Sequence, residues 1–192
     1  KADARFLCLH QAVEGAQVGP SNYTFRSGND VVRMADLPPE VDAVLAGHIH
    51  RRQTLTHYRP DGSAMPIVYP GSIERTSFAE RLEPKGYVDL TVGGPGHDGR
   101  RHLEFAFVPL PARPMEEIVL GRELGRSGLP AFLTSRLSGL DPDSIVRISC
   151  DEELPSEVKA AVTGELLRTV CPATMNFQFG AGFLGRPGRD GR

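Results

Sequence analysis

The sequence predicts a mixed fold of class α/β (α+β), and three kinds of observation support this prediction. Short apolar runs bounded by turn residues fit strands at residues 5–9, 42–46, 53–58, 66–69, 86–92 and 101–109. Longer amphipathic patterns fit helices at residues 129–140 and 155–170. Closely spaced prolines separate the strand-rich part of the chain from the part that contains these helices. We therefore expect two domains joined by a stiff connector.

Pro109, Pro111 and Pro114 mark the expected boundary, because closely spaced prolines cannot continue a strand ladder and favour an extended link. Behind them the pattern predicts a helix, a strand, a helix and a strand, with the two strands at residues 144–150 and 174–179. We expect three parts: a first domain at residues 1–112, a small domain at residues 113–180, and a flexible tail rich in glycine and arginine at residues 181–192.

A long segment rich in Gly, Ser, Asn and Asp, residues 13–39, separates the first two predicted strands. This composition favours a surface loop that contains at most a short helix at residues 31–34. Long loops in compact domains are often functional or mobile, so this loop is a candidate functional segment.

Composition and charge argue against a membrane protein and against a general affinity for nucleic acid. The chain has 192 residues, of which 40% are hydrophobic, and this is enough for a real core. No apolar stretch approaches the roughly 20 residues of a membrane-spanning helix, and no signal peptide is visible. The formal net charge is -2, so contacts with nucleic acid would come from local basic groups, namely Arg51/Arg52, Arg75, Arg81/Lys85 and Arg100/Arg101. Each group is more often a solvated surface charge.

The three cysteines indicate a reducing compartment. Cys8 and Cys150 lie inside predicted strands, and Cys171 lies at the end of a predicted helix. An odd number of cysteines in such settings is typical of buried thiols rather than disulfides. We therefore expect buried thiols and a cytoplasmic location.

The motif Gly47-His48-Ile49-His50 directly follows an apolar strand. In extended backbone, residues two apart point to the same side, so both imidazoles can face one shallow pocket. Gly47 lets the backbone come close to whatever lies there. His10 follows the first strand in the same way and is a third candidate. Since imidazole is a common ligand of zinc, iron, manganese, copper and nickel, the sequence predicts a metal site that contains His10, His48 and His50.

Two further features suggest contacts with phosphate. Tyr69-Pro70-Gly71-Ser72 fits a tight turn after a strand, which places the Ser72 hydroxyl and backbone N–H groups where they can help to hold an anion. Arg51, Arg52 and Arg75 flank the expected strand ends, where they can contact DNA phosphates. These three arginines and Ser72 are therefore the candidate phosphate- or DNA-contacting residues.

Five motifs occur in the order His10-Gln11, Gly47-His48-Ile49-His50-Arg51, Tyr69-Pro70-Gly71-Ser72, Phe78-Ala79-Glu80 and Lys85-Gly86-Tyr87. Together they resemble the calcineurin-like metallophosphoesterases and, among these, the SbcD-type DNA repair exonuclease subunits. The resemblance covers about residues 4–114, and the unit that follows resembles the small capping domain of that family. It implies the C-terminal portion of a two-sheet metallophosphoesterase sandwich flanked by helices, followed by a small α/β capping domain.

The resemblance also implies an activity and its cofactors. The family works as an exo- and endonuclease on DNA ends in repair, as a homodimer with an SMC-like ATPase of the SbcC type. It implies two divalent metal ions, usually manganese, of which His10 and His48 would bind one and His50 the other. Two cations roughly 3.5–4 Å apart can activate a water and neutralise the phosphodiester oxygens. No catalytic residue beyond these ligands is implied for this chain.

The chain departs from the family pattern at its start. The early Asp-x-His, a bridging aspartate and an Asn-His motif should supply the remaining ligands and the general acid, yet neither Asp-x-His nor Asn-His occurs in the sequence. Because the chain opens with Lys1 and enters a strand almost at once, we expect these motifs upstream. We therefore expect residues 1–192 alone to be inactive and the complete protein to be a nuclease.

Two other interpretations stay open. A metallophosphoesterase acting on small phosphodiesters or nucleotides would carry the same histidine motifs, although the unit behind Pro114 argues against it. A non-catalytic DNA- or partner-binding scaffold that begins near Lys1 would keep the fold without the chemistry. The residues encoded upstream distinguish this scaffold from a nuclease.

Overall fold

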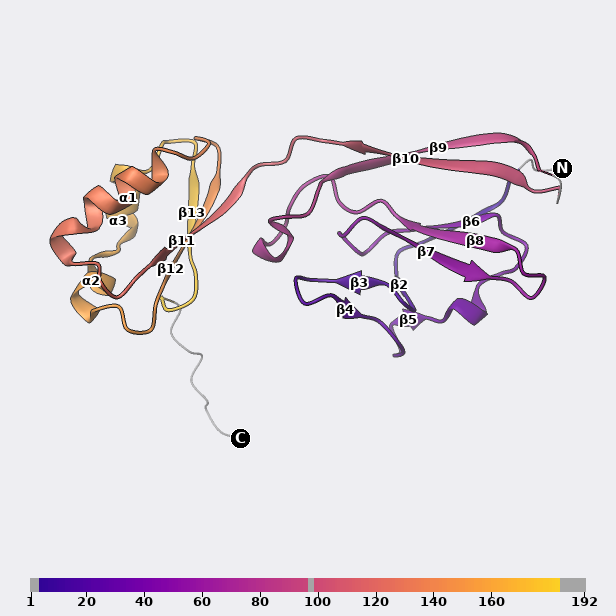
Figure 1. The fold of residues 1–192 in the computed structure, drawn as a ribbon, viewed down its shortest axis with the longest axis horizontal. Helices are drawn as coiled ribbons and strands as arrows, with labels where there is room; N and C mark the ends of the chain where they lie inside the picture. The colour runs from indigo at the N-terminus through magenta and orange to yellow at the C-terminus, as the bar shows by residue number, and fades with distance from the viewer. Residues whose placement is uncertain (1–3, 97–98, 184–192) are drawn as a thin grey trace. The chain divides into compact units, whose positions relative to one another are not determined.

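A computed structural model describes residues 4–96 and 99–183 of the chain (Figure 1). The chain divides into two compact units, Lys1–Ala112 and Arg113–Arg192, which we call unit 1 and unit 2. The described residues contain several small sheets and three α-helices, so the fold has the mixed α+β character that the sequence predicts. None of these helices has the length and apolar character needed to cross a membrane.

A four-stranded sheet forms the centre of unit 1. Across the sheet the strands are β1 (Phe6–Leu9), β6 (Ala43–Ala46), β8 (Ala64–Tyr69) and β7 (Gln53–Tyr58). β1, β6 and β8 run parallel, whereas β7 pairs with β8 in an antiparallel hairpin. Because parallel strands end at the same edge of a sheet, the residues that follow β1, β6 and β8 meet there. These residues are His10, residues 47–50 and residues 70–72.

The segment at residues 13–39 is folded against the sheet and is not a loose surface loop. It contains the two-residue strands β2 (Ala12–Val13), β3 (Gln17–Val18), β4 (Tyr23–Thr24) and β5 (Val31–Val32), and the 3-10 helix η1 (Met34–Asp36). The short helix expected near residues 31–34 begins at Met34, as η1, because the β-branched Val31 and Val32 pair with β2 instead. Buried apolar residues of the segment, such as Val13 and Leu37, join the core under β6 and β8.

Two longer strands, β9 (Gly86–Pro95) and β10 (Arg101–Pro109), form an antiparallel hairpin, and they include the strands predicted at residues 86–92 and 101–109. Figure 1 shows this hairpin over one face of the four-stranded sheet, with β2 to β5 at the opposite face. β8 lies beside β6 in parallel, and within the described residues β9 pairs with β10 alone.

Tyr69, fully buried at the end of β8, ties the chain behind β1 to the sheet. Its hydroxyl donates to the backbone oxygen of Gln11 (2.9 Å) and accepts from the N–H of Val13 (2.8 Å). Burial raises the pKa of this hydroxyl. The two bonds fix the backbone directly after His10, so Tyr69 helps to hold His10 in place at the end of β1.

Unit 2 contains a parallel three-stranded sheet, with β12 (Ile145–Cys150) between β11 (Met115–Leu120) and β13 (Asn176–Phe179). The helices α1 (Leu129–Leu137), α2 (Ser156–Ala161) and α3 (Gly164–Val170) connect the strands and cover one face of the sheet (Figure 1). Strands and helices share one apolar core, which includes Ile118, Leu133, Ile148, Val158 and Leu167.

Two predictions for unit 2 are wrong. The unit begins with strand β11, which was missed because Glu116 and Glu117 interrupt its apolar pattern. The helix expected at residues 155–170 is two helices. Thr163 starts the second of them, since its Oγ1 accepts from the N–H of Leu166 (3.2 Å) as an N-cap. The helix at residues 129–140 and the strands at residues 144–150 and 174–179 are confirmed with shorter bounds.

The expected tail at residues 181–192 is partly folded. The backbone oxygen of Ala181 accepts from the N–H of Cys150 (3.0 Å), and Phe183 packs against the core of unit 2. The rest of that prediction, residues 184–192, lies outside the described residues.

All three cysteines have free thiols, and each lies in the predicted kind of element. Cys150 is buried and Cys171 is partly buried, and burial raises the pKa of the Cys171 thiol. The prediction that all three are buried is wrong for Cys8, which is exposed on the edge strand β1.

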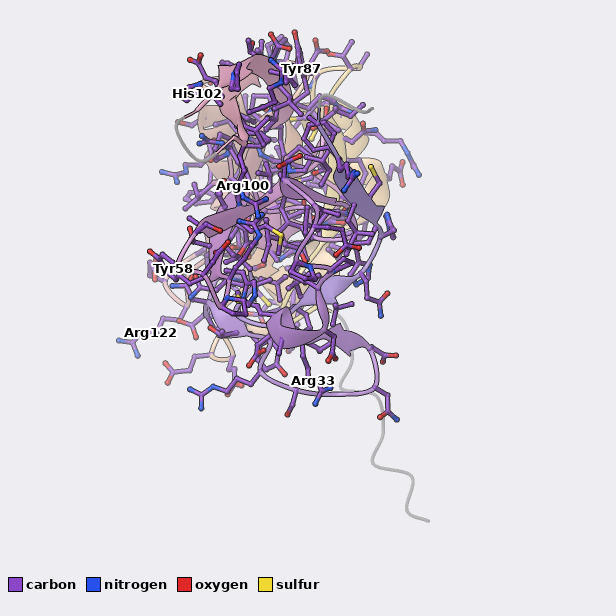
Figure 2. All side chains as sticks on the ribbon, turned by 90° about the vertical axis from the view of Figure 1, so that its right-hand side faces the viewer. Arg33, Tyr58, Tyr87, Arg100, His102 and Arg122 are labelled. Carbon is purple, nitrogen blue, oxygen red and sulfur yellow. The ribbon has the colours of Figure 1, made fainter. Side chains whose placement is uncertain are left out.

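Replacing Tyr69 with Phe should destabilise unit 1 by about 1–3 kcal/mol, because the buried N–H of Val13 loses its acceptor. All four tyrosines lie in unit 1 and the chain has no tryptophan, so the fluorescence of the remaining tyrosines during urea unfolding reports on this unit alone. Tyr58→Phe is the matched control, since Tyr58 is 70% exposed and projects from the surface (Figure 2). Equal midpoints for the two variants would contradict the role of Tyr69.

Candidate functional site

The ends of β1 and β6 bring two imidazoles into contact. The ring centroids of His10 and His48 lie 5.5 Å apart, with the rings edge to face. His50 lies one residue beyond Ile49, and its Nδ1 faces Glu80 and Thr76 instead of the other two rings. All three histidines are exposed. The structure therefore joins His10 with His48 and places His50 beside this pair with partners of its own.

The backbone around His48 differs from the expected extended conformation. β6 ends at Ala46, and His48 has a φ of 77°, in the left-handed region that residues other than glycine rarely adopt. Ile49 is buried in the core, with 3% of its surface exposed, and anchors the motif between the two outward histidines. Such a conformation is held only where the surroundings enforce it and is common at functional sites.

Gly47 permits the approach of His10, as its place in the motif suggests. A Cβ atom at position 47 would lie 2.7 Å from Nδ1 of His10, closer than real Cβ atoms come to a neighbour. Any side chain here would push the His10 ring away from His48. Gly47 is therefore required by the contact between the two rings and not by an unusual φ.

His48 and His50 line the same pocket, as the sequence predicts, although the backbone at His48 is left-handed and not extended. The pocket has a volume of about 310 Å³, at the low end of the range of roughly 300–1,000 Å³ for small-molecule sites. One wall comes from the segment that contains Val18 and Phe25, and the other from residues 77–83, with the carboxylates of Glu80 and Glu83. It is open to solvent and lies directly beside the histidines.

A cluster of hydrogen-bonded and charged groups around the buried Lys85 lies next to the pocket. The side chain of Lys85 has no exposed surface, and its Nζ donates to Glu80 Oε2 at 2.6 Å and to Ser72 Oγ at 2.9 Å. It also donates to the backbone oxygen of His50 at 3.2 Å and lies 3.4 Å from Glu83 Oε2. The other Glu80 oxygen, Oε1, accepts from Thr76 Oγ1 at 2.8 Å and lies 3.1 Å from His50 Nδ1.

Glu80 stays ionised in this cluster. Burial by itself raises the pKa of the carboxyl group, but the hydrogen bonds from Lys85, Thr76 and His50 outweigh burial and lower the pKa from 4.5 to about 2. An ionised carboxylate is the partner that a fully buried ammonium group needs. Glu80 and Lys85 are therefore a charged pair at neutral pH.

The residues present fit part of a metal shell. His10 and His48 offer two neighbouring imidazoles, and His50 has a carboxylate behind its ring, an arrangement typical of metal-binding histidines. Residues 4–96 and 99–183 contain no group of three or more His, Cys, Asp or Glu side chains placed to hold one ion. Two imidazoles are thus the donor set that the described chain brings together.

Ser72 and Arg51 have structural partners. The Ser72 hydroxyl donates to the Glu74 backbone oxygen (2.7 Å) and accepts from Lys85, while its N–H donates to the His50 backbone oxygen (3.2 Å). Arg51 donates to Glu83, and also to Asn22 Oδ1 and the Gly19 backbone oxygen. The donors expected to be free for an anion are therefore used inside the protein, where they brace the pocket walls.

The other two candidate arginines differ in exposure. Arg52 is exposed, and its guanidinium lies 4.5 Å from the centre of the Phe107 ring, a stacking contact that leaves the N–H edges accessible. Arg75 is half-buried and donates to the Glu83 backbone oxygen at 3.2 Å. Arg52 is thus the best placed of the three to meet a phosphate.

Local sequence patterns do not indicate that Glu80, Glu83 and Lys85 support the histidine site. Two of them lie in motifs that carried the family resemblance, and Lys85 was interpreted as a surface charge beside Arg81. One feature of the sequence is consistent with the burial of Lys85. This lysine lies five residues after Glu80 and directly before β9, so its side chain can fold back to the Glu80 carboxylate.

A comparison with known protein families assigns no family to the chain, because no family model matches it.

Replacing Gly47 with Ala should separate His10 from His48 with little loss of stability, because the His10 ring can rotate away from the new methyl group. If the two rings hold a metal ion, Zn²⁺ affinity measured by calorimetry should fall about tenfold or more, the order of effect found when groups that orient metal ligands are changed. Gly94→Ala is the control, since a Cβ there meets nothing within 4 Å. Unchanged Zn²⁺ affinity in Gly47→Ala would rule out a site made by these two rings.

Acidification should destabilise unit 1 as Glu80 takes up a proton. Its contribution is complete above pH 4.5 and is lost as the pH falls towards 2, because the folded-state pKa is the lower one. A lowering from 4.5 to about 2 corresponds to about 3 kcal/mol. Urea unfolding followed by tyrosine fluorescence at several pH values measures this loss, and Glu80→Gln should lose less over the same range. Parallel pH profiles would contradict the assigned pKa.

Proposed function

We propose that this chain is part of a metal-dependent DNA nuclease subunit of the SbcD type, which hydrolyses phosphodiester bonds at DNA ends. The observation that carries the proposal is the contact between His10 and His48 at the ends of two parallel strands, together with the pocket that His48 and His50 both line. Open parallel sheets bind ligands outside the carboxyl ends of their strands. Imidazoles gathered at such an edge are typical of a transition-metal site.

In this proposal His10 and His48 hold one divalent ion and His50 holds the other, manganese being the expected metal. Bound metal would lower the pKa of a water nucleophile and neutralise phosphodiester oxygens. The chain's own residues orient the ligands: Gly47 admits the His10 ring, Ile49 anchors the motif, and Glu80 holds the His50 ring. The remaining ligands and the general acid would come from upstream residues, so residues 1–192 alone would be inactive.

Contact with DNA is proposed for Arg52 in particular. Stacking on Phe107 fixes the direction of its guanidinium, which lowers the entropy lost on binding a phosphate. Arg51 and Arg75 act indirectly, because their bonds to the segment around Glu83 hold the pocket wall in place.

The remaining parts of the proposal follow from the family resemblance. Unit 2 would be the capping domain, and the complete protein would be a homodimer that works with an SbcC-type ATPase. A cytoplasmic location is also proposed, and the three free thiols agree with a reducing compartment.

Manganese-dependent degradation of linear DNA tests the function directly. We expect activity in the chain extended by its upstream residues, loss of that activity in the extended His48→Ala variant, and no activity in residues 1–192 alone. Activity on small phosphodiesters but not on DNA would favour a different metallophosphoesterase. An inactive extended protein that still binds DNA or an ATPase would establish a scaffold instead.

The Arg52→Ala variant tests the DNA contact. If Arg52 neutralises one phosphate, the slope of log affinity against log salt concentration should become shallower by about 0.7–0.9. This slope can be measured from the binding of fluorescent single- and double-stranded oligonucleotides at salt concentrations from about 50 to about 200 mM. Arg136→Ala, an exposed arginine on α1, is the control. An unchanged slope would make Arg52 a surface charge without this role.

A further inference from the structure

We propose that Glu80, held by Lys85, fixes His50 as the tautomer with hydrogen on Nδ1 and so leaves Nε2 as the ring nitrogen with a free lone pair. Glu80 is then a positioning residue that acts through His50. The link to metal binding rests on the proposed function, whereas the tautomer is a property of this chain alone.

Both neighbours of His50 Nδ1 require it to be a donor. Glu80 Oε1, 3.1 Å away, belongs to the carboxylate that pairs with the buried ammonium group of Lys85 through Oε2 at 2.6 Å, and a carboxylate in such an ion pair only accepts hydrogen bonds. Thr76 Oγ1, also 3.1 Å away, already donates its hydrogen to Glu80 Oε1 at 2.8 Å, so it can only accept from the ring. A lone pair on Nδ1 would face two oxygen atoms without a hydrogen between them.

The Glu80 carboxylate has little freedom to turn away. Lys85 Nζ holds Oε2 at 2.6 Å, and Thr76 holds Oε1. The same ammonium group donates to the backbone oxygen of His50. Lys85 therefore fixes the backbone of His50 directly and its ring through Glu80, and its complete burial prevents water from competing for these bonds.

The second ring nitrogen is left for a ligand. Among the described residues, Nε2 of His50 has no hydrogen-bond partner, and the side chain is 45% exposed on the pocket that His48 also lines. A neutral imidazole in water favours hydrogen on Nε2, so the Glu80 contact reverses the ordinary preference. Carboxylates behind metal-binding histidines fix the tautomer in this way.

Nitrogen-15 spectra of the histidine-labelled chain at neutral pH test the tautomer without metal. We expect His50, assigned with a His50→Gln variant, to show hydrogen on Nδ1 and a lone pair on Nε2. Glu80→Ala should return His50 to the ordinary tautomer equilibrium, while His57 on β7 stays unchanged as an internal control. Because Glu80→Ala removes the nearer of the two carboxylates beside the buried Lys85, the Glu80→Ala/Lys85→Met double variant provides a second form in which both members of the Glu80–Lys85 pair are uncharged.

The outcomes separate this inference from the proposed function. A wild-type His50 with hydrogen on Nε2, or on both nitrogens, would overturn the inference. An unchanged His50 spectrum in both variants would also overturn it, because the tautomer would then not depend on Glu80. The expected spectra together with a 10- to 100-fold loss of Zn²⁺ affinity in the variants, of the order given for such partners, would support both. The expected spectra in a chain that binds no Zn²⁺ would support the tautomer and contradict the metal site.

Discussion

A fully buried lysine sets the architecture of the candidate site. The ammonium group of Lys85 is buried away from water. Because an unpaired buried charge has a high free-energy cost, the acceptors around this group are held in place to pair with it. Removing one partner of such a pair costs about 3–5 kcal/mol. Through Glu80, Ser72 and the His50 backbone oxygen, Lys85 joins the chain behind β6, the turn behind β8 and the segment that leads into β9.

The parallel order of β1, β6 and β8 supplies the second constraint. It brings the residues behind three strands to one edge, where Gly47 allows the rings of His10 and His48 to meet. Tyr69 secures the chain behind β1, and Lys85 secures the chain behind β6. The histidines are exposed, yet their backbone is fixed by buried groups, which is the combination that a preorganised ligand site needs.

Local patterns in the sequence predict much of this arrangement. Apolar runs identify β1, β6, β7 and β8, and the residues behind them identify the three histidines. Local patterns cannot show that His48 turns into the left-handed region, since tertiary contacts of Ile49 and the His10 ring enforce that turn. They also assign Lys85 to the surface, because a lysine is buried only when distant groups supply its acceptors, and these lie up to 35 residues away in sequence. The division at Thr163 depends on a single cap.

The central claim is that His10, His48 and His50 form one metal-binding edge. Titrating Mn²⁺ into the chain and following the histidine ring signals by NMR tests it most directly, because the paramagnetic ion broadens signals only in its neighbourhood. The account predicts that these three histidines broaden at low Mn²⁺ concentration, while His57 on β7 keeps its line width. Uniform broadening of all histidines, or none at the three, would contradict it.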